Sequence, residues 1–181
     1  MRLHLVRHLA PQVAPGVCYG RTDLAVDPEL QALALPALRA SLPAGAPIFS
    51  SPLRRCAGLA QALGGDAVQY DPRLAELDFG DWEMRRWDDI DRAGVDAWAA
   101  DMAGYRPGGG ESVTDMARRV AAFYADCIHL PAPGAIVICH AGTIRLLAAR
   151  ARGLGIEAMA LEAAQHPHAI GYGETVVIDC V

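Results

Sequence analysis

The sequence contains no lysine. All 16 of its basic residues are arginine, 21 residues are acidic, and the formal net charge is −5. A protein that binds nucleic acid through broad phosphate attraction normally carries a basic face and an excess of positive charge. The balance here therefore argues against a nucleic-acid partner. Any anion site must be built from guanidinium groups, histidine and backbone N–H groups.

Structural cross-links and long apolar runs are also lacking. The five cysteines are widely spaced and form no CxxC pair or Cys/His cluster, so neither a disulfide framework nor a metal site is indicated. His166 and His168 look like a metal pair, but Pro167 stands between them and no further ligands follow, which favours a loop. No run of 18 apolar residues occurs and the start has no signal-peptide core. We expect no membrane span and a reducing, cytoplasmic location.

The 181 residues, 52% of them apolar, are enough for one compact domain over residues 1–181. Helices and strands alternate, which predicts an α/β domain with helices on both faces of a sheet. Residues 71–110 have the least regular pattern and hold all three tryptophans, for which anchoring the segment is favoured over lining a cleft. Pro36 is expected to kink or split the first helix. Apolar patterns predict strands at 3–6, 46–49, 67–70, 135–139 and 175–179, and helices from 28 and over 52–63, 112–128 and 143–152.

Two predicted strands run straight into a histidine, His8 after the first and His140 after the fourth. Ligands of open α/β sheets gather at the carboxyl ends of the strands. Either histidine alone could be a mere strand cap, but two at matching strand ends favour a site. Cys139 should point away from that site, because adjacent strand residues face opposite sides.

Several groups suited to an anion accompany these histidines. Ala141 and Gly142 bring backbone N–H groups to a helix start, and Arg7 and the pair Arg54-Arg55 bring guanidinium groups. Together they indicate a phosphoryl group. A proton donor for the leaving oxygen could come from the stretch 74–83, in which acids alternate with apolar residues. The residues alone do not choose among its four acids, and a solvated acidic turn is the other interpretation. The four are Glu76, Asp78, Asp81 and Glu83.

Six segments, in this order, resemble the histidine phosphatase superfamily, also called phosphoglycerate mutase-like. They cover most of the chain, from residue 5 to residue 142. The fold that the resemblance implies is a three-layer α/β/α sandwich. The segments are Leu-Val-Arg-His (5–8), Cys-Tyr-Gly-Arg-Thr-Asp-Leu (18–24), Ser-Ser-Pro-Leu-Arg-Arg-Cys (50–56), Leu-Ala-Glu-Leu-Asp-Phe-Gly-Asp-Trp-Glu (74–83), Pro-Gly-Gly-Gly-Glu-Ser (107–112) and Cys-His-Ala-Gly (139–142).

The resemblance also implies roles for individual residues. His8 would be the phosphorylated nucleophile and Glu76 the acid–base residue, with no metal and no cofactor. Glu111 would either contact substrate or supply negative charge at a helix start. The phosphoryl oxygens would be held by Arg7, Arg55 (rather than Arg54) and His140, and the substrate mouth and backbone donors would be Tyr19, Gly20, Arg21, Ala141 and Gly142.

Within the superfamily, residues 18–24 and the short length most resemble the alpha-ribazole phosphatases, which remove a 5′-phosphate from a small metabolite. A phosphoglycerate mutase is less expected, since the chain ends two residues after Asp179 and leaves no tail over the site. A phospholigand-binding module without turnover is the third alternative. Two positions depart from the family pattern, Leu9 and Met84, where glycine is usual. The ester cleaved and the oligomeric state stay open.

Overall fold

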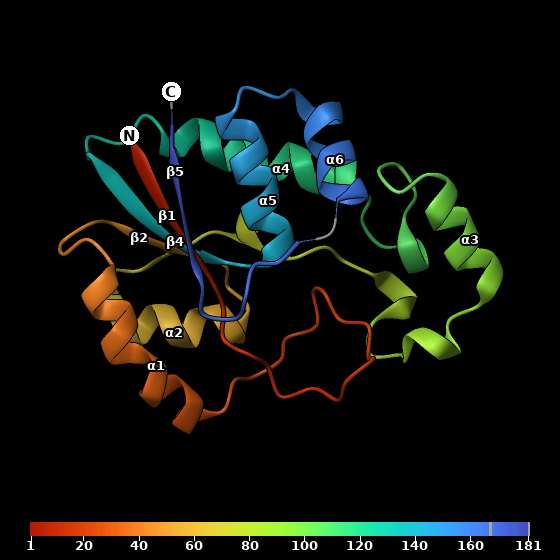
Figure 1. The fold of residues 1–181 in the computed structure, drawn as a ribbon, viewed down its shortest axis with the longest axis horizontal. Coiled ribbons are helices and arrows are strands. Elements are labelled where there is room, and N and C mark those ends of the chain that lie inside the picture. The colour runs from red at the N-terminus through yellow and green to blue at the C-terminus, as the bar shows by residue number, and fades with distance from the viewer. Residues whose placement is uncertain (167, 181) are drawn as a thin grey trace.

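A five-stranded sheet forms the centre of the molecule in the computed structural model, which describes residues 1–166 and 168–180 (Figure 1). The strand order is β3-β2-β4-β1-β5, and only β5 runs antiparallel to its neighbour. All five predicted strands are confirmed, with ends shifted by at most two residues. They are β1 (Arg2–Arg7), β2 (Ile48–Ser50), β3 (Gln69–Tyr70), β4 (Gly134–Cys139) and β5 (Thr175–Asp179).

Helices cover both faces of this sheet, so the predicted three-layer α/β/α sandwich is confirmed (Figure 1). One layer holds α1 (Pro28–Ser41) and α2 (Arg54–Gly64), and the other holds α4 (Val113–Cys127), α5 (Ala141–Ala151) and α6 (Ile156–Gln165). The short helix α3 (Arg92–Ala100) lies to the side of these layers. Among the described residues, no helix has the length and apolarity that crossing a membrane requires.

Three local expectations need correction. The first helix is not split, because α1 runs without a break from Pro28 to Ser41 through Pro36, an exposed residue. α3 lies inside the segment predicted to be irregular and buries no residue, so its apolar pattern is weak. α6 was not predicted at all, since its buried residues are mainly alanines, which give little periodic signal.

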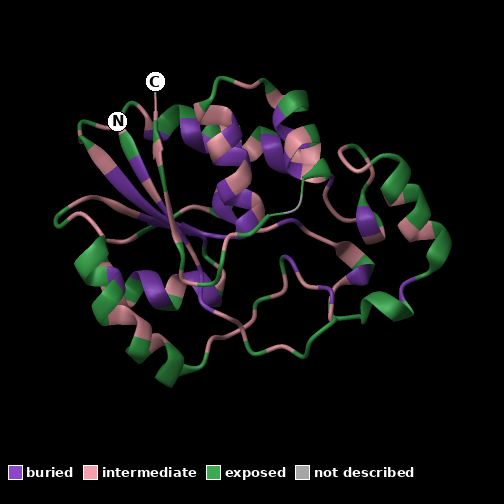
Figure 2. Cartoon of the chain, viewed as in Figure 1, coloured by how far each residue is buried: buried purple, intermediate pink, exposed green. Residues whose placement is uncertain are grey.

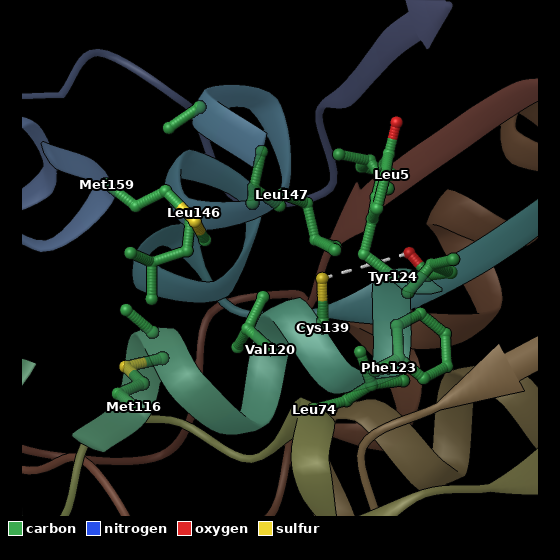
Figure 3. Close-up of a cluster of buried hydrophobic side chains, with 14 of the residues drawn as sticks. Leu5, Leu74, Met116, Val120, Phe123, Tyr124, Cys139, Leu146, Leu147 and Met159 are labelled. Carbon is green, nitrogen blue, oxygen red and sulfur yellow. Dashed lines mark hydrogen bonds between the residues drawn. The ribbon is translucent and has the colours of Figure 1, made fainter. Parts of the chain in front are cut away.

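The main core lies between the sheet and α4, α5 and α6, and Figure 2 shows buried residues concentrated on the strands and the inner helix faces. Figure 3 shows Val120 and Phe123 of α4 in the same buried cluster as Leu5 and Leu147. Cys139 is fully buried in this cluster, as predicted for a strand residue that faces away from the site. These contacts hold α4 and β4 in the core, so the residues that follow β4, beginning with His140, start from a fixed position.

Candidate active site

The two histidines meet because of the strand register. Arg7 pairs with Cys139 in the parallel ladder between β1 and β4, so the residues that follow, His8 and His140, leave the sheet side by side. Their ring centroids are 5.1 Å apart. Both are buried, with 3% and 0% of their surface exposed. The sheet therefore brings together the two residues that the sequence placed at strand ends.

The tautomer of His8 is fixed by its backbone. Nδ1 lies 2.7 Å from the carbonyl oxygen of Leu9, and a carbonyl only accepts, so Nδ1 carries the proton. Nε2 is then left with a free lone pair. Burial lowers the pKa of His8 to about 3; the hydrogen bond to Leu9 opposes this shift, and the charges of Arg55 and Arg7 add to it. His8 is thus a neutral imidazole with an available nucleophilic nitrogen.

His140 is positioned by two side chains of the segment 50–56. Its Nε2 lies 2.9 Å from the hydroxyl oxygen of Ser51 and 3.5 Å from the thiol of Cys56. Burial, followed by the charge of Arg55, holds the pKa of His140 well below its usual range. Ser51 and Cys56 belong to a segment that the sequence matched to the family without giving these two residues a role.

Two arginines stand beside the histidines. Arg55, in the first turn of α2, is 1% exposed and donates to the carbonyls of Thr22, at 2.7 Å, and Gly20. Arg7 donates to the carbonyl of Ile170 at 2.5 Å. The Nε of each is buried without a hydrogen-bond partner in the described part of the chain, which suits an oxyanion acceptor. Arg54, the alternative within the pair, is exposed.

Of the four acids in the stretch 74–83, Glu76 reaches the site. Its Oε2 accepts the N–H of Gly142 at 3.2 Å, and its Oε1 accepts the N–H of Leu77 at 3.1 Å. Gly142 must be glycine for this approach, because a Cβ there would collide with the Glu76 carboxylate. Asp78 instead accepts the N–H of Gly80, and Asp81 is exposed.

Glu83, the fourth acid, organises the loop that carries residues 19–22. Its carboxylate accepts the N–H groups of Gly20 (3.0 Å), Arg21 (2.8 Å) and Thr22 (3.1 Å), the hydroxyl of Thr22, and the N–H of Phe79 (3.0 Å). Burial alone would raise the pKa of Glu83, but these hydrogen bonds outweigh it and the pKa is lowered. Sequence reasoning did not assign this role, which depends on contacts about 60 residues apart.

The substrate-mouth residues occupy different positions. Gly20 is required by space, since a Cβ would collide with the carbonyl oxygen of Leu77. Arg21 is exposed and lies 3.7 Å from Asp78. The hydroxyl of Tyr19 pairs at 2.7 Å with that of Tyr172, whose ring stacks 3.9 Å from the Arg7 guanidinium. Tyr172 also lies 5.5 Å from the His8 ring. Sequence reasoning missed it, because no motif marks it.

A cavity of about 400 Å³ opens beside this cluster. It is lined by five of the residues named from the sequence, Arg7, Tyr19, Glu76, Ala141 and Gly142. Trp87, Trp98 and Phe79 also line it, so the expectation that the tryptophans only anchor their segment is wrong for Trp87 and Trp98. Trp82 does anchor the segment, buried against Cys18 and Ile90. A larger hollow, about 520 Å³, lies at the amino ends of the strands and contains none of the predicted site residues.

The two departures from the family pattern have different structural consequences. Leu9 is buried, keeps a negative φ, and packs within van der Waals reach of Gly173, next to Tyr172. The loop after His8 is therefore built differently from one that needs glycine. Met84 instead adopts φ 63°, where a side chain is strained. Glu111, left between two roles, forms a bidentate ion pair with Arg119.

No grouping of three metal-ligating side chains occurs among the described residues. Pro167, which separates His166 from His168 in the sequence, lies outside them. A neutral imidazole with a free nitrogen beside buried guanidinium groups and a carboxyl group suits phosphoryl transfer through a histidine. The arrangement is therefore suited to a phosphoryl group.

Known proteins agree with that interpretation. A model of the histidine phosphatase superfamily (branch 1) matches residues 3–170, and the chain belongs to this family. It is 34% identical over 119 residues to an adenosylcobalamin/alpha-ribazole phosphatase of Escherichia coli (strain K12), covering 62% of this chain and 59% of the relative. It is also 34% identical over 123 residues to a glucosyl-3-phosphoglycerate phosphatase of Mycolicibacterium vanbaalenii, covering 61% and 55%. The chain thus spans under two thirds of these relatives.

Solved structures are matched over more of their length. The alpha-ribazole phosphatase of Shigella flexneri superposes with a TM-score of 0.81 at 28% identity, covering 99% of this chain and 90% of that one. A mycobacterial glucosyl-3-phosphoglycerate phosphatase superposes with a TM-score of 0.77 at 25% identity, covering 97% and 88%. Both neighbours are named as phosphatases, but for different esters.

Proposed function

We propose that this chain is a phosphomonoesterase that works through a phosphohistidine on His8 and needs no metal or other cofactor. The observation that carries the proposal is the hydrogen bond from Nδ1 of His8 to the Leu9 carbonyl, which leaves Nε2 unprotonated. Burial keeps this imidazole neutral at physiological pH. Family membership and the phosphatase names of the relatives support the same reaction.

The reaction has two steps. In the first, Nε2 of His8 attacks phosphorus, the ester P–O bond breaks, and Glu76 gives its proton to the leaving oxygen. In the second, Glu76 takes a proton from water, the water oxygen attacks phosphorus, and the P–N bond breaks to release inorganic phosphate and neutral His8. Arg7, Arg55, His140 and the N–H groups at the start of α5 stabilise the equatorial oxygens in both steps. Tyr19, Gly20 and Arg21 form the substrate mouth in this proposal.

Alpha-ribazole 5′-phosphate is the substrate we propose. The names of the E. coli and S. flexneri relatives support it. The cavity adds a physical reason, because Trp87, Trp98 and Phe79 offer flat apolar surfaces beside Glu76 on which a heteroaromatic base can stack. Stacking a base on an aromatic side chain contributes about 1–3 kcal/mol. Trp98→Leu should therefore lower kcat/KM about 5- to 160-fold for this ester and leave glycerol phosphate unaffected.

A substrate panel separates this ester from the alternatives. It contains alpha-ribazole 5′-phosphate, glucosyl-3-phosphoglycerate, and 3-phosphoglycerate with and without 2,3-bisphosphoglycerate. Highest kcat/KM for the first supports the substrate proposal, and a preference for the second overturns it. Turnover of 3-phosphoglycerate that depends on the bisphosphate would instead indicate a mutase. Phosphate binding without hydrolysis of any ester would indicate a binding module.

The nucleophile is tested by a matched pair of variants. His8→Ala removes the proposed nucleophile, whereas His4→Ala alters the same strand near its other end, where His4 borders the hollow at the amino ends. We expect His8→Ala to abolish phosphate release and His4→Ala to keep it. A fully active His8→Ala enzyme would overturn the proposed function.

We also propose that the chain is a single domain and that it is cytoplasmic. The five cysteines, none of which forms a disulfide, support the cytoplasmic location.

A further inference from the structure

The segment that carries Glu76 has no regular secondary structure to hold it. Residues 75–79 lie between two short 3₁₀ turns and belong to no helix or strand. A carboxyl group that delivers a proton must stay within hydrogen-bond reach of the leaving oxygen. Something outside the segment therefore has to fix its backbone.

Arg119 of α4 supplies that support. Its Nη1 donates to the carbonyls of Arg73 (2.7 Å) and Ala75 (2.6 Å), and its Nη2 donates to the carbonyl of Glu76 itself (3.2 Å). The remaining two N–H groups, on Nε and Nη2, bind the two oxygens of Glu111 at 2.7 Å each. All five donors of the guanidinium group are thus used.

Glu111 completes the arrangement from the other side. Its carboxylate orients the Arg119 fork, and its backbone N–H donates to the carbonyl of Asp78 at 2.8 Å. The two side chains are only 19% and 15% exposed, so their charges are poorly screened by solvent. α4, on which Arg119 stands, begins with a capping box of Ser112 and Asp115 and is packed into the core.

We propose that Arg119, oriented by Glu111, is a positioning residue for Glu76. It does not touch the substrate. It fixes the backbone before and at Glu76 to α4, while the backbone N–H of Glu111 holds Asp78 on the other side. The carboxyl group of Glu76 therefore stays against Gly142 and the cavity. This inference rests on the proposed function, in which Glu76 transfers the proton.

The role predicts a dependence on the leaving group. p-Nitrophenolate leaves without a proton, whereas an alkoxide needs one. In Arg119→Met, rapid-quench formation of the phosphoenzyme should slow at least about 10-fold with glycerol 2-phosphate, within the range of general-acid effects. The p-nitrophenol burst from p-nitrophenyl phosphate should stay within about 3-fold. Glu76→Gln should slow phosphoenzyme formation from glycerol 2-phosphate more strongly and leave the p-nitrophenol burst similarly unchanged. The double variant Arg119→Met/Glu76→Gln should be no slower with glycerol 2-phosphate than Glu76→Gln alone.

Two further variants keep the test sharp. Arg118→Met is the matched control, because Arg118 is the neighbouring arginine of α4 but is 59% exposed and pairs with Asp115. It should react like the wild-type enzyme with both esters. Arg119→Lys keeps the charge but loses the planar fork, so it should be intermediate, and it carries the test if Arg119→Met does not fold.

The outcomes are distinguishable. Equal slowing with both esters, or no slowing with either, overturns the positioning role while leaving the proposed function intact. A wild-type enzyme that forms no phosphoenzyme from either ester contradicts the proposed function, and this inference with it. Selective slowing with glycerol 2-phosphate supports both.

Discussion

The two sides of the site are built by different means. On the side that we propose binds phosphate (the phosphate side), His8 and His140 follow directly from paired strands, and Arg55 stands in the first turn of α2. On the side that we propose transfers the proton, Glu76 lies on irregular backbone that is held by charged side chains. The sheet ladder positions one side, whereas a few ion pairs and side chain–backbone hydrogen bonds position the other. The two sides should therefore respond differently to single substitutions.

The largest effect is expected on the phosphate side. Arg55→Met removes a buried guanidinium that we propose holds the phosphoryl group, and it should lower kcat/KM by about 10²- to 10³-fold, as the loss of one transition-state donor typically does. Arg54→Met, at the exposed neighbour, should change it less than about twofold. Steady-state kinetics on one ester measures both. Equal losses in the two variants would contradict the placement of Arg55 inside the site.

Glu83→Gln tests an acid of the irregular segment that supports the phosphate side. The substitution removes the charge that binds the backbone of residues 20–22, which in turn receives the Arg55 guanidinium. Losing charge-assisted hydrogen bonds should lower the free energy of unfolding by about 1.5–3 kcal/mol, and we expect kcat/KM to fall as well. Urea denaturation and kinetics measure the two effects. Asp81→Asn, at an exposed acid of the same segment, is the control and should change neither.

Acidification should destabilise the phosphate side first. His8 and His140 have lowered pKa values in the folded protein, so below pH 6.5 the unfolded chain binds more protons than the folded one. The free energy of unfolding therefore falls as the pH is lowered. For His8, whose folded pKa is about 3, the loss between pH 7.5 and 5.0 should be about 2 kcal/mol. Urea denaturation at the two pH values tests this, and His8→Gln should reduce the dependence. Equal stability at both pH values would contradict a buried neutral pair.

The smallest effect is expected at Met84, in the irregular region. Its φ of 63° strains any side chain, so Met84→Gly should raise the free energy of unfolding by up to about 1 kcal/mol. Met84→Ala keeps the strain and removes only the half-exposed side chain, so it should give no such gain. Thermal denaturation of both variants measures the change in the free energy of unfolding. Equal changes in the two would show that backbone conformation is not the cause.

The same contrast explains which features could be predicted. Apolar runs that end in histidine indicate strands, and parallel strands bring their carboxyl ends together, so the meeting of His8 and His140 follows from local patterns. The choice of Glu76 among four acids depended on the family resemblance. Its physical reason, the approach to Gly142 across 66 residues, is not visible in any local pattern.

Supporting residues were the hardest to foresee. Arg119 contacts the Glu76 backbone 43 residues away, and Tyr172 meets Tyr19 across 153 residues. Neither has a sequence signal that distinguishes it from a surface residue. Helices were missed for a related reason, because α3 buries nothing and α6 buries small residues that give a weak periodicity. Such features follow from tertiary contacts, which the chain specifies only as a whole.

The most direct test of the account is to trap the covalent intermediate. The enzyme is mixed with a ³²P-labelled phosphate ester, quenched in alkali, digested, and the labelled peptide is identified. We expect phosphate that is stable in alkali, labile in acid and located on His8, and no label in His8→Ala. The absence of covalent phosphate from an enzyme that hydrolyses the ester, or its presence on another residue, would contradict His8 as the nucleophile.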